Sequence, residues 1–82
     1  MDIEFDPIKD AINREKHGIS LARAADIDVK AYVTDGRFAE PRFRLYGLID
    51  GIAYCVAGTD RGGRVRIISV RRAHAKEMNR YV

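Results

Sequence analysis

Hydrophobic residues recur at helical spacing in the first third of the chain and at every second position in the middle. The helical pattern begins directly after Asp6-Pro7, an N-cap acid followed by proline at the first helical position. The apolar positions, which we expect to face inward, are Ile8, Ala11 and Ile12. The positions off that stripe are Lys9, Asn13 and Lys16. Gly18 is expected to end this helix, and Ser20 to cap a second, short helix that ends before Lys30.

Strand patterns occupy most of the remaining chain. Ile3 and Phe5 indicate a short first strand, and alternation from Lys30 onward predicts four more, over residues 31–34, 42–49, 52–59 and 64–71. Asp50-Gly51 predicts a type I′ turn and residues 60–63 close the next hairpin, so the last three strands should form an antiparallel meander. Helical spacing returns over residues 72–80. We therefore expect an α+β fold, a small antiparallel sheet with N-terminal helices packed on it and a short C-terminal helix.

The size and composition fit one folded domain over residues 1–82. Eighty-two residues lie near the lower limit at which one hydrophobic core suffices, and 46% hydrophobic with 33% charged residues is ordinary for a soluble protein. No apolar run is long enough to span a bilayer, and the first ten residues lack the pattern of a secretory signal. The single cysteine, Cys55, lies in an apolar run and is expected to be buried. We expect a cytoplasmic protein without a membrane partner.

Positive charge is concentrated in the last third of the chain. Residues 61–82 carry seven basic side chains against the single acid Glu77, whereas residues 1–60 carry eight basic and eleven acidic side chains. Six of the seven are arginines, whose planar guanidinium groups suit bidentate binding of phosphates. This distribution indicates a polyanion, and first of all a nucleic acid, as the partner.

Strict alternation along the last strand divides its side chains between two faces. One face is expected to carry Arg64, Arg66, Ile68, Val70 and Arg72. The other face is expected to carry Val65, Ile67, Ser69 and Arg71. Ordinary exposure to solvent explains each of these arginines, taken alone, as well as a binding site does. Their clustering is what favours a binding site.

Few motifs of known chemistry are present. The two histidines and one cysteine lack metal-ligand spacing, no serine lies in a nucleophile motif, and Gly62-Gly63 lacks the ending of a phosphate loop. We therefore expect neither a metal nor another cofactor.

His17 lies at the end of the first helix, where it either complements the helix dipole or acts as an acid, a base or a phosphate contact. His74 is expected at the surface. With Glu40 and Tyr81, the basic residues suffice for metal-free RNA cleavage, because the ribose 2′-hydroxyl supplies the nucleophile.

The chain resembles the BrnT family of bacterial type II toxins nearly from end to end. The matching residues are Phe5-Asp6-Pro7, Lys9, Asn13, Lys16-His17-Gly18-Ile19-Ser20, Glu40, Arg42, Gly47, Arg64-x-Arg66-Ile67-Ile68-Ser69-x-Arg71-Arg72-Ala73 and Glu77-x-x-x-Tyr81. The resemblance implies a fold similar to the RelE ribonuclease toxins and RNA cleavage that arrests translation. It also implies neutralisation by a BrnA-like antitoxin, whose ribbon-helix-helix part would bind operator DNA so that the joint complex represses its own operon.

Our hypothesis is that the protein is an RNA endonuclease, either independent of the ribosome or linked to it. The candidate catalytic residues are His17, Glu40, Arg42, Arg66 and Arg71. The candidate RNA-binding residues are Lys9, Lys16, Arg64 and Arg72. Arg42, Arg66 and Arg71 are expected to converge with His17 on one pocket, where the arginines stabilise the scissile phosphate and His17 or Glu40 moves protons. The alternative is a non-catalytic module that binds nucleic acid or the antitoxin and acts in operon autorepression.

Overall fold

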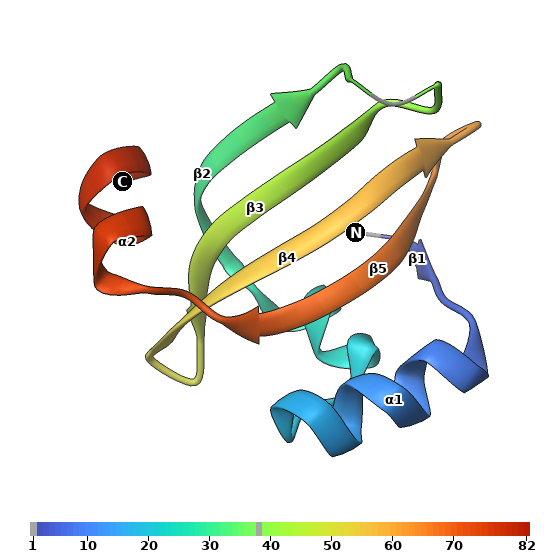
Figure 1. Cartoon of the computed structure of the whole chain (residues 1–82), viewed down its shortest axis with the longest axis horizontal. Coiled ribbons are helices and arrows are strands. Elements are labelled where there is room, and N and C mark those ends of the chain that lie inside the picture. Colours follow the sequence, from blue (N-terminus) through green and yellow to red (C-terminus); the bar gives the residue numbers. More distant parts are fainter. Residues whose placement is uncertain (1, 38) are drawn as a thin grey trace.

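The computed structural model describes residues 2–37 and 39–82, which form one five-stranded sheet with helices on both sides (Figure 1). The elements in chain order are β1 (Ile3–Glu4), α1 (Pro7–His17), the 3₁₀ helix η1 (Leu21–Asp26), β2 (Asp28–Asp35), β3 (Arg42–Ile49), β4 (Ile52–Arg61), β5 (Arg64–Arg72) and α2 (Ala75–Tyr81). The strand order is β1-β5-β4-β3-β2, antiparallel except for the parallel pair of β1 and β5.

The expected α+β class and the meander are confirmed. The second expected helix is a 3₁₀ helix, so α1 is the single N-terminal α-helix in the described residues. None of the helices in this part of the chain is long and apolar enough to cross a membrane.

Local sequence signals set the element boundaries. The Asp6 carboxylate accepts a hydrogen bond from the Ile8 backbone N–H at 2.8 Å, as an N-cap residue does, and Pro7 begins the helix. Gly18 ends α1 in the left-handed conformation with φ of 71°. Asp50 and Gly51 have φ angles of 52° and 77°, the positive values that a type I′ turn requires. These three predictions are confirmed.

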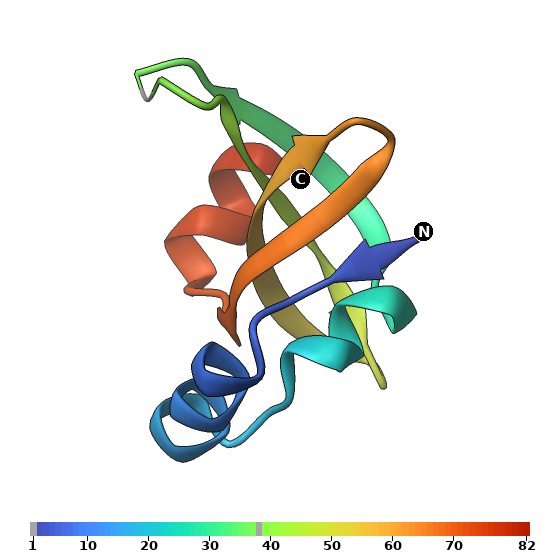
Figure 2. The same ribbon diagram turned by 90° about the vertical axis from the view of Figure 1, so that its right-hand side faces the viewer.

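The hydrophobic core lies between the sheet and η1, and Figure 2 shows α2 on the opposite side of the sheet. Leu21 and Ala24 of η1 are fully buried. The sheet residues that form the core with them are Phe43, Leu45, Ile49, Val56, Ile67 and Val70. The other sheet face, which carries Tyr46, Cys55 and Arg71, is covered at one end by α2 and is open elsewhere. Cys55 is buried, as expected.

The orientation of α1 is the opposite of the one expected from its apolar stripe. Ile8 and Ile12 are 72% and 57% exposed, whereas Asn13 is buried at 5%. The reason is the edge of β5: β1 pairs with β5 only at Val65 and Arg66, which leaves the later part of that edge without a strand partner. Asn13 fills this gap. Its Nδ2 donates to the Val70 carbonyl at 2.9 Å, and its Oδ1 accepts from the Val70 N–H at 3.3 Å.

A β-bulge at Ile68 corrects the expected division of arginines between the two faces of β5. Ala57 pairs with Ser69 but its neighbour Gly58 pairs with Ile67, so Ile68 is the extra residue. Beyond the bulge Thr59 pairs with Arg66, and Arg42 of β3 also pairs with Thr59. Arg66 therefore lies on the same face as Ser69 and Arg71, and Arg42 joins it there.

Gly58 is required at this bulge. A Cβ placed on Gly58 would lie 2.6 Å from the Arg66 carbonyl oxygen and 2.8 Å from the Phe43 ring, so no larger residue fits. The sequence pattern could not indicate the bulge, because Arg64 to Arg72 alternates without a glycine or proline of its own.

Asn13→Ala should destabilise the protein by about 2–3 kcal/mol, because it leaves the buried N–H and carbonyl of Val70 without partners. Urea unfolding of this variant checks the expectation, with the exposed Glu15→Ala on the same helix as the control. Equal free energies of unfolding for the two variants would show that Asn13 does not hold α1 on the sheet.

Candidate functional site

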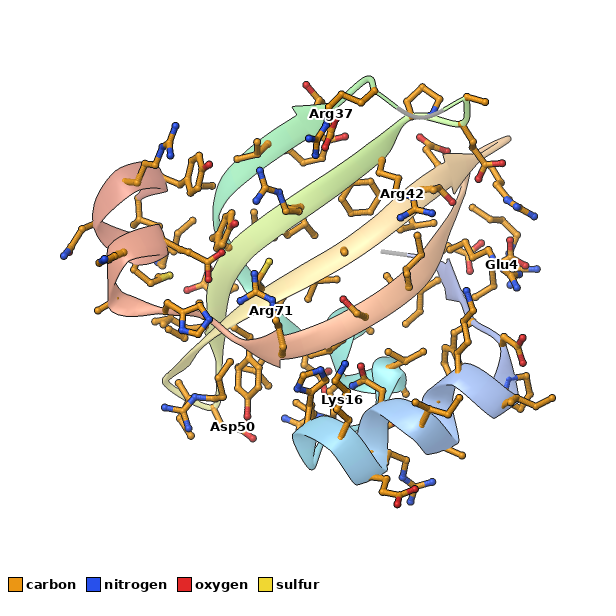
Figure 3. All side chains as sticks on the ribbon, viewed as in Figure 1. Glu4, Lys16, Arg37, Arg42, Asp50 and Arg71 are labelled. Carbon is orange, nitrogen blue, oxygen red and sulfur yellow. The ribbon has the colours of Figure 1, made fainter. Side chains whose placement is uncertain are left out.

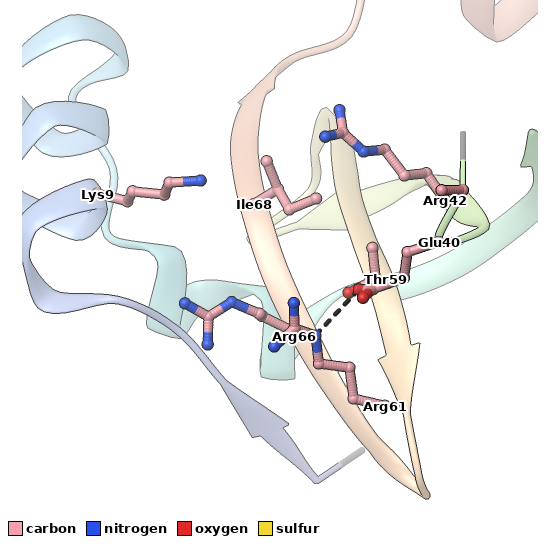
Figure 4. Close-up of a pocket in the computed structure, with 8 residues that line it drawn as sticks. Lys9, Glu40, Arg42, Thr59, Arg61, Arg66 and Ile68 are labelled. Carbon is pink, nitrogen blue, oxygen red and sulfur yellow. Dashed lines mark hydrogen bonds and ion pairs between the residues drawn. The ribbon is translucent and has the colours of Figure 1, made fainter. Parts of the chain in front are cut away.

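A hollow of about 340 Å³ lies on the open sheet face between α1 and the segment before β3 (Figure 4). Its walls come from four separate parts of the chain. The lining residues are Lys9, Ala39, Glu40, Arg42, Thr59, Arg61, Arg66 and Ile68. Four of these side chains are cationic and one is a carboxylate, so the hollow is a site of concentrated positive charge.

The carboxylate in the hollow is held in its ionised form. Arg61 Nε donates a hydrogen bond to Glu40 Oε1 at 3.0 Å, and this bond lowers the pKa of the Glu40 carboxyl, with smaller effects from Thr59 and from the charge of Arg66. An ionised Glu40 can accept a proton at neutral pH but cannot donate one. The Thr59 hydroxyl lies beside this carboxylate without forming an aligned hydrogen bond, and it is a buried oxygen without a partner among the described residues.

Two cations of the hollow form no ion pair with a described residue. Within residues 2–37 and 39–82, neither Lys9 nor Arg66 forms an ion pair, whereas Arg61 is paired with Glu40. Arg66 is half-buried on β5 and Lys9 projects from α1 toward the same space (Figure 4). Because like charges in one hollow repel, an anion placed between Lys9 and Arg66 would relieve that repulsion.

A second hollow of about 300 Å³ adjoins the first along α1 and β5. It is lined by Lys9, Ile12, Asn13, Lys16, His17, Ile68 and Ser69. Lys9 and Ile68 line both hollows, so the two are neighbours on one surface. We call the two hollows together the cationic groove.

Arg71 lies on the same sheet face but is already neutralised. Its two terminal nitrogens donate to Glu77 Oε1 and Oε2 of α2, each at 2.8 Å. Tyr46 donates to Glu77 Oε2 at 2.9 Å, and its ring stacks on Tyr81 with centroids 4.9 Å apart. The bonds from Arg71 lower the pKa of Glu77 to about 2, and in turn raise the pKa of Arg71. This ion pair fixes α2 to the sheet.

The nine residues predicted for the site are thus divided by the structure into three groups. Four of them line the first hollow, namely Lys9, Glu40, Arg42 and Arg66. Lys16 and His17 line the second hollow. Arg71, Arg64 and Arg72 line neither hollow, so the expected convergence of Arg71 with the other arginines and His17 is wrong. Figure 3 shows Arg71 and Arg42 separated along the sheet.

Arg64 and Arg72 contact other residues instead. Arg64 lies 3.7 Å from a carboxylate oxygen of Asp2, and Arg72 lies over the Tyr54 ring at 5.9 Å from its centroid. Because Arg72 pairs with Tyr54, which packs against the core, it belongs to the opposite face of the sheet.

Sequence reasoning missed four residues that line the first hollow, Ala39, Thr59, Arg61 and Ile68. Arg61 is recognisable only as a member of the basic third, Ile68 only as part of the matching block from Arg64 to Ala73, and nothing in the sequence marks Ala39 or Thr59. In the described part of the chain, no three histidine, cysteine or acidic residues are grouped as metal ligands would be.

A small α+β protein that gathers four cations around one carboxylate on an open sheet face has a charge distribution that suits a phosphate ligand. Residues 5–77 match the model of the family described as the ribonuclease toxin BrnT of type II toxin-antitoxin systems. The chain belongs to this family, which confirms the resemblance seen in its motifs. Membership in a type II toxin family implies an RNA target and an antitoxin partner.

A solved structure supports the assignment. The 1.1 Å crystal structure of the Brucella abortus ribonuclease toxin BrnT is similar to this chain with a TM-score of 0.71 and 26% sequence identity. The match covers 90% of this chain and 97% of the Brucella chain. No curated protein sequence matches the chain.

The Glu77 pair should make stability depend on pH in the acid range. A folded-state pKa of about 2, below the ordinary 4.5, means that ionised Glu77 stabilises the fold above about pH 4.5, and that this contribution is lost as the pH falls toward 2. Allowing for partial solvent screening, Glu77→Gln should cost about 2 kcal/mol at pH 6 and almost nothing at pH 2. Thermal unfolding across this range measures it, with exposed Glu15→Gln as control. A constant difference between wild type and Glu77→Gln would contradict the assignment.

Proposed function

We propose that this protein is a metal-independent endoribonuclease whose active site is the cationic groove. The observation that carries the proposal is the ionised Glu40 in a hollow where Lys9 and Arg66 form no ion pair with a described residue. A base beside several cations is the combination that RNA cleavage by the ribose 2′-hydroxyl requires.

Each group has a role in the proposed reaction. Glu40 removes the proton of the 2′-hydroxyl, the 2′-oxygen attacks the adjacent phosphorus, and Arg66 and Arg42 neutralise the extra negative charge of the five-coordinate transition state. The bond to the 5′-oxygen then breaks, and that oxygen takes a proton. His17 in the adjoining hollow is the candidate donor. The products are a 2′,3′-cyclic phosphate and a free 5′-hydroxyl.

Lys9 and Lys16 would bind the flanking phosphates, because both lie on α1 along the cationic groove and form no ion pair with a described residue. Arg71 has a different role in this proposal. Its bonds to Glu77 favour positioning of α2 over contact with RNA, since a phosphate at Arg71 would have to displace a bidentate carboxylate.

The proposal extends to the biology of the family. We infer that RNA cleavage arrests translation in the cytoplasm, that a BrnA-like antitoxin neutralises the toxin, and that the complex binds operator DNA through the antitoxin. We also infer that the fold is of the RelE type. The support is membership of the type II toxin family and the antiparallel meander with a helix at each end.

The alternative of a non-catalytic binding module has one observation in its favour. Glu40 already accepts a hydrogen bond from Arg61, and a carboxylate engaged in this way is a weaker base. The two functions differ in a growth assay, because expression without antitoxin stops growth for a ribonuclease and is tolerated for a binder.

Arg66→Ala should lower the rate of RNA cleavage by roughly 10²-fold, the cost of removing one charge-stabilising group from a transition state. The matched control is Arg14→Ala, which removes an exposed arginine of α1 that lines neither hollow and should leave the rate unchanged. The measurement is degradation of a defined RNA by purified proteins of equal thermal stability. An equal rate for Arg66→Ala and Arg14→Ala would remove Arg66 from the site.

Glu40→Gln should abolish cleavage but keep or strengthen RNA binding, because it removes the base and also a negative charge that repels phosphate. Cleavage rate and affinity for a non-cleavable 2′-O-methyl oligoribonucleotide are measured in parallel. If wild type binds this oligonucleotide but cleaves no RNA, the protein is instead a non-catalytic binding module.

EDTA should leave the cleavage rate of wild type unchanged, because the cationic side chains supply the charge neutralisation that a divalent metal would otherwise provide. The same RNA assay with and without EDTA checks this expectation. Loss of activity in EDTA that added Mg²⁺ or Mn²⁺ restores would contradict a metal-independent mechanism.

A further inference from the structure

Two isoleucines on α1 face solvent although the same helix buries an asparagine. Ile8 and Ile12 are 72% and 57% exposed, and they lie four residues apart, so they occupy the same side of the helix. Burying such a side chain is favourable, and folding of the isolated protein leaves a large part of this gain unused at both positions. We call these two residues the isoleucine stripe.

The isoleucine stripe borders the cationic groove. Ile12 itself lines the second hollow, together with Lys9 and Lys16 of the same helix. Both lysines are exposed and form no ion pair within the described residues. One side of α1 therefore presents two apolar anchors next to two unpaired positive charges.

We propose that the isoleucine stripe and these two lysines form the docking surface for the antitoxin, and that the docked segment is an acidic amphipathic helix. Docking here would make the antitoxin inhibit by covering the cationic groove, and this consequence rests on the proposed function. Apolar residues of the segment would pack on Ile8 and Ile12, and its carboxylates would pair with Lys9 and Lys16.

The chemistry of the surface favours this occupant over two others. RNA binds through phosphates and bases, and an isoleucine pair offers neither a charge nor an aromatic ring for them. A second copy of this chain would bring the same lysines against the first in a two-fold interface, which places like charges together. An acidic segment satisfies both the apolar and the positive parts of the surface.

Docking at this place would also block RNA. Lys9 lines both hollows, so a protein segment paired with it would occupy the path between Arg66 and His17. Antitoxin and RNA would then compete for one surface, and inhibition would need no change in the shape of the toxin.

Ile8→Asp tests the proposal without entering the groove, because Ile8 lines neither hollow. Folding should be retained, since an acidic residue in the first turn of a helix interacts favourably with the helix dipole. We expect its affinity for the purified antitoxin encoded with this toxin to fall at least tenfold by titration calorimetry, the size of a lost interface anchor. At saturating RNA, cleavage by the free variant should equal that of wild type. The control is Val29→Asp, which changes an exposed apolar residue of the distant strand β2 and should bind the antitoxin as wild type does.

A competition assay completes the test. Antitoxin should displace the 2′-O-methyl oligoribonucleotide from wild type and from Val29→Asp at similar concentrations, and from Ile8→Asp only at concentrations at least tenfold higher.

Equal antitoxin affinity for Ile8→Asp and Val29→Asp would overturn the docking surface. If the toxin forms dimers that Ile8→Asp disrupts, and the antitoxin affinity is unchanged, the isoleucine stripe is an interface between two copies. That result would equally overturn the docking surface. Simultaneous binding of antitoxin and oligonucleotide would overturn inhibition by occlusion. If wild type cleaves no RNA, the proposed function fails, while the calorimetric comparison still decides where the antitoxin docks.

Discussion

The rest of the structure depends on the buried amide of Asn13, which joins α1 to the edge of β5. Its Nδ2 donates to the carbonyls of Ile19 and Val70 and its Oδ1 accepts from the Val70 N–H, so one side chain satisfies both backbone groups of Val70 on the edge of β5 that β1 leaves unpaired. The isoleucines of α1 consequently face solvent, and its residues Lys9, Lys16 and His17 line the groove. The groove exists because the helix is attached through a polar contact and not through an apolar stripe.

Charge pairing within the protein decides which cations remain for a ligand. Arg61 and Arg71 bind Glu40 and Glu77, and these pairs stabilise the segment before β3 and the helix α2. Lys9 and Arg66 form no ion pair with a described residue, and the bulge at Ile68 turns Arg66 onto the open face. The basic third of the sequence therefore contains arginines of two kinds, those that hold the structure and those that line the groove.

Much of the fold could be predicted from the sequence, because local signals set it. The proline after Asp6, the glycine at position 18 and the Asp50-Gly51 turn each depend on neighbouring residues alone, and the strands follow from alternation. The orientation of α1 and the convergence of site residues could not be predicted in this way. Asn13 is buried by a partner 57 residues away, and the bulge requires Gly58 on the neighbouring strand. Arg71 was assigned to catalysis because nothing in its spacing shows that Glu77 binds it.

The central claim is that RNA occupies the groove between α1 and β5. NMR titration of the 82-residue protein with the 2′-O-methyl oligoribonucleotide tests it directly, because backbone amide shifts report the contact surface residue by residue. The account predicts that the largest shifts fall at Lys9, Thr59, Arg66 and Ile68, with little change in α2. Shifts confined to α2 and the neighbourhood of Arg71, with none at these four residues, would contradict it.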